Sequence, residues 1–179
     1  MRGQDIRDFG SGRTGMSNIL RNAGVKAAAT VFVLDCSKGI LSVFLARYVI
    51  GDGAPEVMAG LVALCGHNWP VFLRFRGGRG ILPGLGGLVV MDPWVALIGA
   101  ALFIFIVSTT RYLSLGSIVG TAFIAVLSLA LTLWWEHHQL YTIYAFAGGS
   151  IIIWQHRDNL RRIIGGTEPR ITIPNRGNT

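Results

Sequence analysis

The sequence predicts an all-α integral membrane protein, a bundle of about six transmembrane helices, some of them short or re-entrant. Two observations predict this fold. Of 179 residues, 51% are hydrophobic and only 14% are charged, whereas soluble domains contain roughly 25% charged residues. The apolar residues also form separate blocks that contain few charges, which is typical of multiple spans rather than one soluble core. The length suits a single domain, residues 1–179.

Six hydrophobic segments follow one another, at about 25–49, 57–73, 80–91, 94–110, 115–135 and 140–155. A helix that crosses a bilayer needs about 20 residues. The second and third segments are shorter, so we expect them to be tilted, interrupted by Gly and Pro, or partly re-entrant. Residues 1–23 precede the first span and carry a motif but no cleavable signal pattern. Residues 168–179 are expected to form a flexible tail.

The net charge of +7 comes from 16 Lys and Arg against 9 Asp and Glu. Basic residues occur before the first segment and after the second, fourth and sixth, while the other connections carry Asp52, Glu56, Asp92 and Glu136. Six spans place both termini and all four basic stretches on one side, which the positive-inside rule identifies as the cytoplasm. Nucleic-acid binding fits poorly, because the basic residues alternate with apolar blocks of membrane length.

The first polar stretch is "GSGRTGMSNILR", residues 10–21. Its glycines permit turns whose N–H groups converge on an anion, and its hydroxyl and amide side chains add donors. The residues concerned are Gly10, Ser11, Gly12, Arg13, Gly15, Ser17 and Asn18. A helix that begins near Ser17 would place Asn18 and Arg21 on one face and point its N-terminus at a phosphate. An ordinary Gly-Ser turn is the alternative.

The second stretch is "GHNWPVFLRFRGGRGI", residues 66–81. Its arginines surround a glycine pair, and such a loop can wrap phosphate oxygens with backbone and guanidinium donors. Its candidate residues are His67, Gly77, Gly78, Arg79 and Gly80. The alternatives are a plain positive-inside loop and, for His67, an interfacial side chain.

The third stretch is "RYLSLGSI", residues 111–118, in which Ser114 and Ser117 lie at the start of a predicted span. On position alone, helix capping is the favoured interpretation of these two hydroxyls.

The fourth stretch is "WQHRDNLRRIIGGTE", residues 154–168. His156 and Asn159 are three residues apart, so they project together from a helix. A neutral His can bind or deprotonate a hydroxyl group while the Asn orients it. The alternative is a favourable interaction of His and Arg with the helix dipole.

Other features suggest structural roles or exclude known chemistry. Asp35 and Lys38 are three residues apart within the first span, as expected of a structural ion pair. Cys36 and Cys65 lie in apolar segments and are interpreted as small buried hydrophobic residues. The sequence contains no GxSxG, HExxH or HxxxxD pattern. A covalent or His–Asp mechanism of acyl transfer therefore has no visible residues.

Together and in this order, the four stretches resemble the acyl-phosphate:glycerol-3-phosphate acyltransferases, the PlsY family of bacterial membrane enzymes. The family pattern runs GSGNxGxTNxxR, GHxxPVFxxFxGGKG, RYxSLGS and HRxNxxRLxxGxE, and "DCSKG" here is similar to the family's DxxKG. The matches extend from about residue 5 to residue 168.

The resemblance implies acyl transfer from acyl phosphate to the 1-hydroxyl of glycerol 3-phosphate, which gives lysophosphatidic acid and phosphate. This is the first acylation of bacterial phospholipid synthesis. It implies no cofactor, no metal and no protein nucleophile, a site on the cytoplasmic face of the inner membrane, and functional coupling to an enzyme that produces acyl phosphate. A non-enzymatic anion or lipid-phosphate transporter or binding protein is the alternative.

The resemblance also assigns roles by position. It makes His156, Asn159 and Ser11 the catalytic residues. Substrate binding falls to Gly10, Gly12, Arg13, Asn18, Arg21, His67, Gly77, Gly78, Arg79, Gly80, Ser114, Ser117 and Glu168. Arg79 stands where the family has Lys, so a planar guanidinium group with several donors replaces a compact ammonium group. Glu168 is expected to order the last cytoplasmic loop.

The chain departs from the family pattern at three places. Arg13 replaces Asn, and Ser17 replaces Thr. The family also has a span before its first motif, so six of seven spans are expected here. A true truncation and a different start site explain this equally well.

Overall fold

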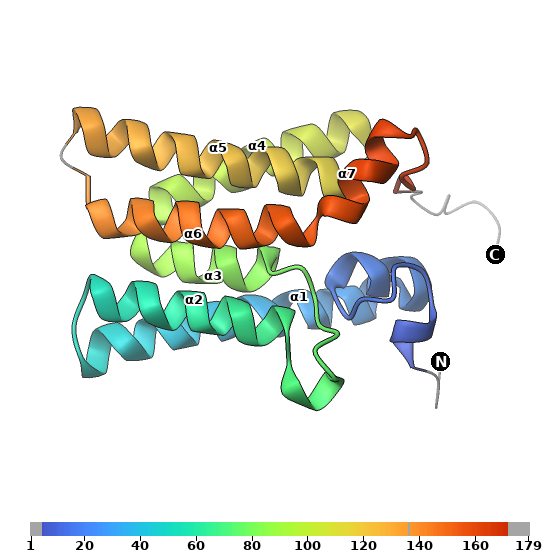
Figure 1. Ribbon diagram of the computed structural model, residues 1–179, viewed down its shortest axis with the longest axis horizontal. Coiled ribbons are helices and arrows are strands. Elements are labelled where there is room, and N and C mark those ends of the chain that lie inside the picture. Colours follow the sequence, from blue (N-terminus) through green and yellow to red (C-terminus); the bar gives the residue numbers. More distant parts are fainter. Residues whose placement is uncertain (1–4, 136, 172–179) are drawn as a thin grey trace.

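The computed structural model describes residues 5–135 and 137–171, and all regular elements among them are helical. The helices are α1 (Met16–Val49), α2 (Ala54–Asn68), α3 (Ile81–Met91), α4 (Pro93–Thr110), α5 (Leu113–Trp134), α6 (Gln139–Gln155) and α7 (Arg157–Ile164), with two short 3-10 turns, η1 (Ile6–Asp8) and η2 (Val71–Leu73). Helices α1 to α6 run alternately along the bundle, and α7 lies at one of its ends (Figure 1). All six predicted segments are confirmed as helices.

The lengths of the helices agree with a multi-pass membrane protein. Helices α1, α4 and α5 are long and apolar enough to cross a bilayer, and α3 is a shorter apolar helix of 11 residues. The two segments expected to be short are short. Helix α2 has 15 residues and ends at Asn68, before η2, so the predicted segment 57–73 is only partly helical.

Helix α1 is interrupted at Gly24, whose φ of 82° is not helical. Glycine adopts this left-handed value without the steric penalty of a side chain. The break separates a first part, residues 16–23, from residues 25–49, which are the predicted first span. The prediction of a helix start near Ser17 is also confirmed, because α1 begins at Met16.

Helices α1 and α3 pack backbone to backbone. A Cβ added to Gly39 of α1 would lie 2.0 Å from the Pro83 carbonyl oxygen, and one added to Gly86 of α3 would lie 2.3 Å from the Cys36 carbonyl oxygen. Small residues permit such close approach between membrane helices, where van der Waals packing stabilises the pair. Cys36 and Cys65 are free and half-buried, and thus less buried than expected.

The bundle is closed at the end away from α7. Glu56 is fully buried there; Arg47 pairs with it, Tyr141 Oη donates to its Oε2 at 2.7 Å, and the backbone N–H of Gly53 donates to the same oxygen at 2.8 Å. These contacts join α1, α2 and α6. An apolar core that includes Val43 and other side chains of α1, α2, α3, α4 and α6 fills the space next to them.

A flexible tail was expected to begin at residue 168, but the first residues of that segment pack against the bundle. Glu168 is buried, and the Ile171 N–H donates to the Arg111 carbonyl at 2.8 Å. Arg170 lies over the Tyr112 ring and donates to its hydroxyl at 3.0 Å. Residues 168–171 are therefore packed against the start of α5, and residues 172–179 lie outside the described part of the chain.

Candidate active site

A cavity of about 310 Å³ lies within the bundle and reaches the end where the four motifs gather. Among its lining residues are these predicted ones: Ser11, Arg13, Asn18, Arg21, His67, Arg79, Gly80, Ser114, Ser117, His156, Asn159 and Glu168. Gly10, Gly12, Gly77 and Gly78 do not line it. The rest of the wall is mostly apolar and includes Phe32, Leu85, Leu88, Phe103 and Ile124. The cavity therefore has one polar, cationic end and one apolar end.

The loop before α1 is held by Asn18, which is 2% exposed. Its amide nitrogen donates to the carbonyls of Ile6, Phe9 and Arg13 at 3.3, 3.1 and 2.8 Å, and its Oδ1 accepts from the Ser11 N–H at 3.1 Å. Asn18 thus braces the loop in this structure, whereas the resemblance assigned it to phosphate. The Ser11 hydroxyl is buried without a partner among the described residues.

The loop turns sharply before Asn18. Gly10 and Gly12 have φ values of 59° and 65°. A Cβ on Gly10 would lie 2.3 Å from Asn18 Oδ1. These glycines allow the turn that carries Ser11 and Arg13 to the cavity, so they shape the site without lining it.

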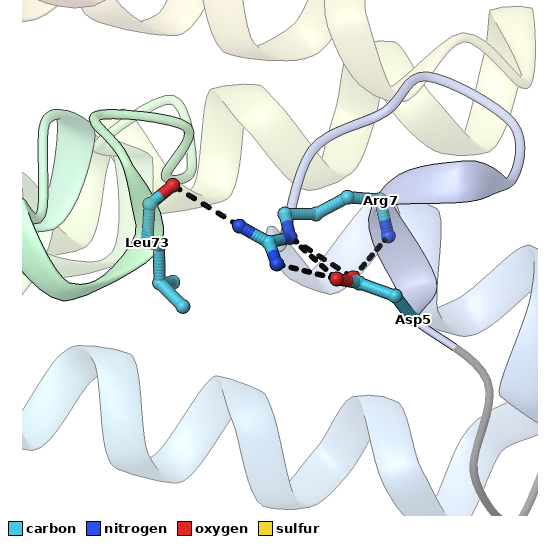
Figure 2. A network of polar contacts seen from close by, with 3 residues as sticks. All are labelled: Asp5, Arg7 and Leu73. Carbon is cyan, nitrogen blue, oxygen red and sulfur yellow. Dashed lines mark hydrogen bonds and ion pairs between the residues drawn. The ribbon is translucent and has the colours of Figure 1, made fainter.

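Arg7 connects this loop to the second motif. Its side chain pairs with Asp5, and its Nη1 donates to the Leu73 carbonyl of η2 at 3.1 Å (Figure 2). The segment just before the first motif is therefore in direct contact with the second motif, 66 residues further along the sequence.

The second motif folds back over the end of α2. The N–H groups of Gly77 and Gly78 donate to the carbonyls of Asn68 and His67. A Cβ on Gly78 would lie 2.0 Å from His67 Nε2, so only glycine fits against this imidazole. The two glycines thus bring the loop close to α2, and Arg79 follows directly at the cavity.

Arg79 is a largely buried cation. Its Nε has no partner among the described residues. Burial, together with the positive charges of Arg13 and Arg162, lowers the pKa of Arg79 to about 10. The guanidinium is still charged at neutral pH and keeps donors for an anionic ligand.

Asp35 contributes a contact that sequence reasoning missed. Lys38 Nζ donates to Asp35 Oδ1 at 2.7 Å, which confirms the predicted pair. The same carboxylate oxygen lies 3.4 Å from His67 Nδ1, and both residues line the cavity. The match of "DCSKG" to the family's DxxKG was the only available signal, because nothing in the spacing connects residue 35 with residue 67.

His156 lies between α6 and α7 and is 4% exposed. Its Nδ1 is 2.8 Å from the Ile152 carbonyl oxygen, which can only accept, so Nδ1 is assigned the proton and Nε2 is left as an acceptor. Burial lowers the pKa of His156 to about 4; the bond to Ile152 opposes this shift, and the positive charge of Arg79 adds to it. The imidazole is neutral at physiological pH.

Glu168 joins α5 to α7. Its Oε1 accepts from Ser114 Oγ at 2.6 Å and from Asn159 Nδ2 at 2.7 Å, and its Oε2 accepts from Arg162 Nε at 2.7 Å. Burial opposes ionisation, but these three donors hold the pKa of Glu168 below its usual value. Asn159 Oδ1 has no partner among the described residues.

The capping interpretation of Ser114 and Ser117 is wrong. Helix α5 begins at Leu113 after Tyr112, so both serines lie inside the helix. Ser114 donates to Glu168, and Ser117 donates to the Leu113 carbonyl at 2.9 Å.

Arg21, another predicted binding residue, is partly used by the protein itself. Its Nη2 donates to the Pro169 carbonyl oxygen at 3.2 Å.

Comparison with known proteins agrees with this geometry. A family model described as glycerol-3-phosphate acyltransferase matches residues 1–166. A glycerol-3-phosphate acyltransferase of Thermoanaerobacter sp. (strain X514) is 41% identical over 167 residues, which cover 93% of this chain and 82% of the relative. One from Gloeobacter violaceus (strain ATCC 29082 / PCC 7421) is 42% identical over 174 residues, covering 95% and 83%.

Two solved structures are also similar. The glycerol 3-phosphate form of PlsY (YgiH), an integral membrane glycerol 3-phosphate acyltransferase, aligns with a TM-score of 0.87 at 34% identity, covering 96% of this chain and 84% of PlsY. Its lysophosphatidic acid form aligns with a TM-score of 0.82 at 33% identity, covering 90% and 81%.

Proposed function

The chain belongs to the glycerol-3-phosphate acyltransferase family, and we propose that it transfers an acyl group from an acyl phosphate to the 1-hydroxyl of glycerol 3-phosphate. The products are lysophosphatidic acid and inorganic phosphate. The solved relatives are forms named for glycerol 3-phosphate and for lysophosphatidic acid. These molecules are the acceptor and the product of this reaction.

The shape and polarity of the cavity are the main support for the acyl-phosphate donor. Ser11 Oγ and Arg79 Nε come from two separate segments, are buried without partners among the described residues, and can donate to phosphate, while the unpartnered Asn159 Oδ1 of the same cavity can accept from a hydroxyl of glycerol 3-phosphate. The other end is apolar, and burial of an acyl chain there is favourable by about 0.8 kcal/mol per CH₂. A phosphate joined to an acyl chain matches both ends.

The reaction needs orientation and charge compensation more than a protein nucleophile. The hydroxyl oxygen bonds to the acyl carbon, the bond from that carbon to the phosphate oxygen breaks, and the hydroxyl proton passes to phosphate. His156 Nε2 accepts the hydrogen bond of the attacking hydroxyl while Asn159 orients the acceptor. Arg79 and the Ser11 hydroxyl donate to phosphate oxygens as negative charge develops on the leaving group.

We further propose that the site faces the cytoplasm from the bacterial inner membrane. By the order of the helices, the motif end of the bundle carries most of the basic residues, among them Arg74, Arg76 and Arg161, and the opposite end carries Asp52 and Asp92. An enzyme that makes acyl phosphate on that side would supply the donor, which is the basis for the expected functional coupling.

The transporter alternative is disfavoured. A transporter is expected to bind its anion near the bilayer midplane, but here the cationic groups lie at one end of the bundle, in and beside the loops. The family membership also favours acyl transfer.

The test uses purified full-length protein in detergent with a radiolabelled acyl phosphate. We expect lysophosphatidic acid and phosphate to form only when glycerol 3-phosphate is present, and acyl-CoA of the same chain length to give no product. Equal use of acyl-CoA would contradict the proposed donor. Absence of product from both donors would contradict acyl transfer itself.

A further inference from the structure

A second cavity of about 360 Å³ lies on the motif end of the bundle, outside the catalytic site. Its walls come from the loop before α1, from the segment after α2, and from the junction of α6 and α7. Four arginines line it: Arg7, Arg13, Arg76 and Arg157. None of its described lining residues is acidic, so it is a concave surface with strong positive charge.

Two of these guanidinium groups are available for a ligand. Arg7 is compensated by Asp5 and bonded to the Leu73 carbonyl, and Arg157 lies over the Trp154 ring with its Nη1 bonded to the Trp154 carbonyl. Arg13 and Arg76 have no carboxylate partner among the described residues within 4.0 Å, since neither forms a salt bridge there. Guanidinium groups without a carboxylate partner favour a phosphate, because each can donate two parallel hydrogen bonds to its oxygens.

Gln155 is a second, independent sign of a ligand. This last residue of α6 is 2% exposed and lines the cavity, yet its amide Nε2 has no partner among the described residues. A buried donor left without an acceptor destabilises the folded state. A phosphate oxygen in the cavity would supply the acceptor.

The surroundings place the cavity at the level of lipid headgroups. Trp69 at the end of α2, Phe75 in the loop after η2 and Trp154 near the end of α6 line it and are 39%, 61% and 63% exposed. Exposed aromatic side chains at the ends of spans are typical of the membrane–water interface. Arg13 lines both cavities, so it marks where they meet.

We propose that this cavity is a second phosphate-binding site, separate from the catalytic pocket and adjoining it at Arg13. Its ligand is a phosphate group, carried either by an anionic lipid at the interface or by a small soluble phosphate. Arg76, Arg13 and Gln155 donate to its oxygens. The proposal does not depend on the identity of the acyl donor. It also gives Arg13, which stands where the family has Asn, a specific role.

The test is protection of single arginines from phenylglyoxal, mapped by mass spectrometry on the full-length protein. Arg76 lines the cavity, while Arg74 of the same exposed loop lines neither cavity and is the internal control. With inorganic phosphate at about ten times its dissociation constant, modification of Arg76 should slow about tenfold. Modification of Arg74 should not change.

A second arm separates the two sources of phosphate. The protein is placed in phosphatidylcholine nanodiscs with or without phosphatidic acid. Protection of Arg76 by inorganic phosphate in detergent identifies a soluble ligand, and protection only by phosphatidic acid identifies a lipid. No protection in either arm, or equal protection of Arg74, would overturn the proposal.

Matched variants connect the protection to this cavity. Arg157→Gln should reduce the protection of Arg76 severalfold, because Arg157 adds charge to the same wall. Arg161→Gln is the control, since Arg161 is on the same helix but lines neither cavity. The acyl-transfer assay runs in parallel on the wild-type protein. In wild type, absence of acyl transfer with Arg76 protected contradicts only the proposed function, and absence of protection with acyl transfer present contradicts only this site.

Discussion

His156 has one tautomer because its surroundings leave it no alternative. Its Nδ1 faces the Ile152 carbonyl, and the side chain is nearly fully buried beside Arg79. A cation nearby and little water both disfavour the imidazolium form. The residue is therefore a neutral acceptor of hydrogen bonds over the whole physiological pH range, which is what binding of a substrate hydroxyl requires.

The first prediction concerns this acceptor. His156→Ala should lower kcat/KM for glycerol 3-phosphate by about 10²–10⁴-fold, the usual effect of losing a residue that handles the reacting proton. His138→Ala is the matched control, because His138 is exposed at the other end of α6. Kinetics of acyl transfer with purified, folded protein measure the effect. Equal activities of the two variants would show that His156 does not contact the reacting hydroxyl.

The second prediction concerns stability against pH. The folded-state pKa of His156, about 4, lies below its ordinary value of 6.5, so between these pH values the unfolded chain binds a proton that the folded protein does not. As the pH falls from about 6.5 to about 4, the free energy of unfolding should decrease by about 3 kcal/mol from this residue, and then level off. The Tm of wild type in detergent should therefore fall more steeply over this range than that of His156→Gln. Parallel Tm profiles would contradict the buried, neutral state.

For single residues, the sequence predicted which side chains lie together in the cavity, but not which groups each side chain contacts. Ser11, Arg79, His156 and Asn159 meet in one cavity as expected. The family resemblance assigned Asn18 to phosphate, and its helical spacing put it on one face with Arg21, yet its amide nitrogen donates to three loop carbonyls. Such bonds depend on how the preceding turn folds back, and spacing along a helix carries no information about that turn.

Among the elements, the pair α1 and α3 depends most on small residues. The backbones approach so closely at Gly39 and Gly86 that neither position has room for a methyl group. Helix α3, with 11 residues, is too short to cross a bilayer alone. Its contacts with α1 therefore compensate for its short length, and they also fix the wall of the cavity that α3 contributes.

The third prediction tests this packing. In Gly39→Ala the new Cβ would lie 2.0 Å from a main-chain carbonyl oxygen, so the helices must separate. We expect a loss of about 1–3 kcal/mol in the free energy of unfolding, as for other overpacked sites. Gly66→Ala is the control, because nothing lies within 4 Å of a Cβ there. Thermal unfolding in detergent measures both variants, and an unchanged Tm for Gly39→Ala would refute the close contact.

The elements themselves were largely predictable. Apolar blocks with few charges and the glycines between them located helices α1 to α6 to within a few residues, except for the end of α2 and the start of α1. The sequence placed His156 and Asn159 on one helix but did not predict α7 as a separate element, because a short helix rich in charged residues forms no apolar block of its own. Helix α7 is held in place through Glu168, whose Oε1 accepts from Asn159 of α7 and from Ser114 of α5, 54 residues away from Glu168 in sequence.

Across the whole molecule, the two ends of the bundle differ in packing and charge. One end is closed by an apolar core and by the buried Glu56 with Arg47. The other end, where α7 lies (Figure 1), carries the four motifs, and both cavities and most of the basic residues belong to it. Alternation of charge along the sequence was enough to predict this polarity, since six antiparallel spans return every second connection to the same side.

The fourth prediction follows from this polarity, because arginine-rich ends are retained in the cytoplasm. Single cysteines are introduced as Asp52→Cys at the closed end and Arg74→Cys at the motif end, in a protein that also carries Cys36→Ala and Cys65→Ala. In intact spheroplasts a membrane-impermeant maleimide should label only the cysteine at position 52. In inverted membrane vesicles it should label only the cysteine at position 74. The reverse pattern would place the cavity on the outer face of the membrane. The proposed orientation, and the proposed supply of acyl phosphate from the cytoplasm, would then both be wrong.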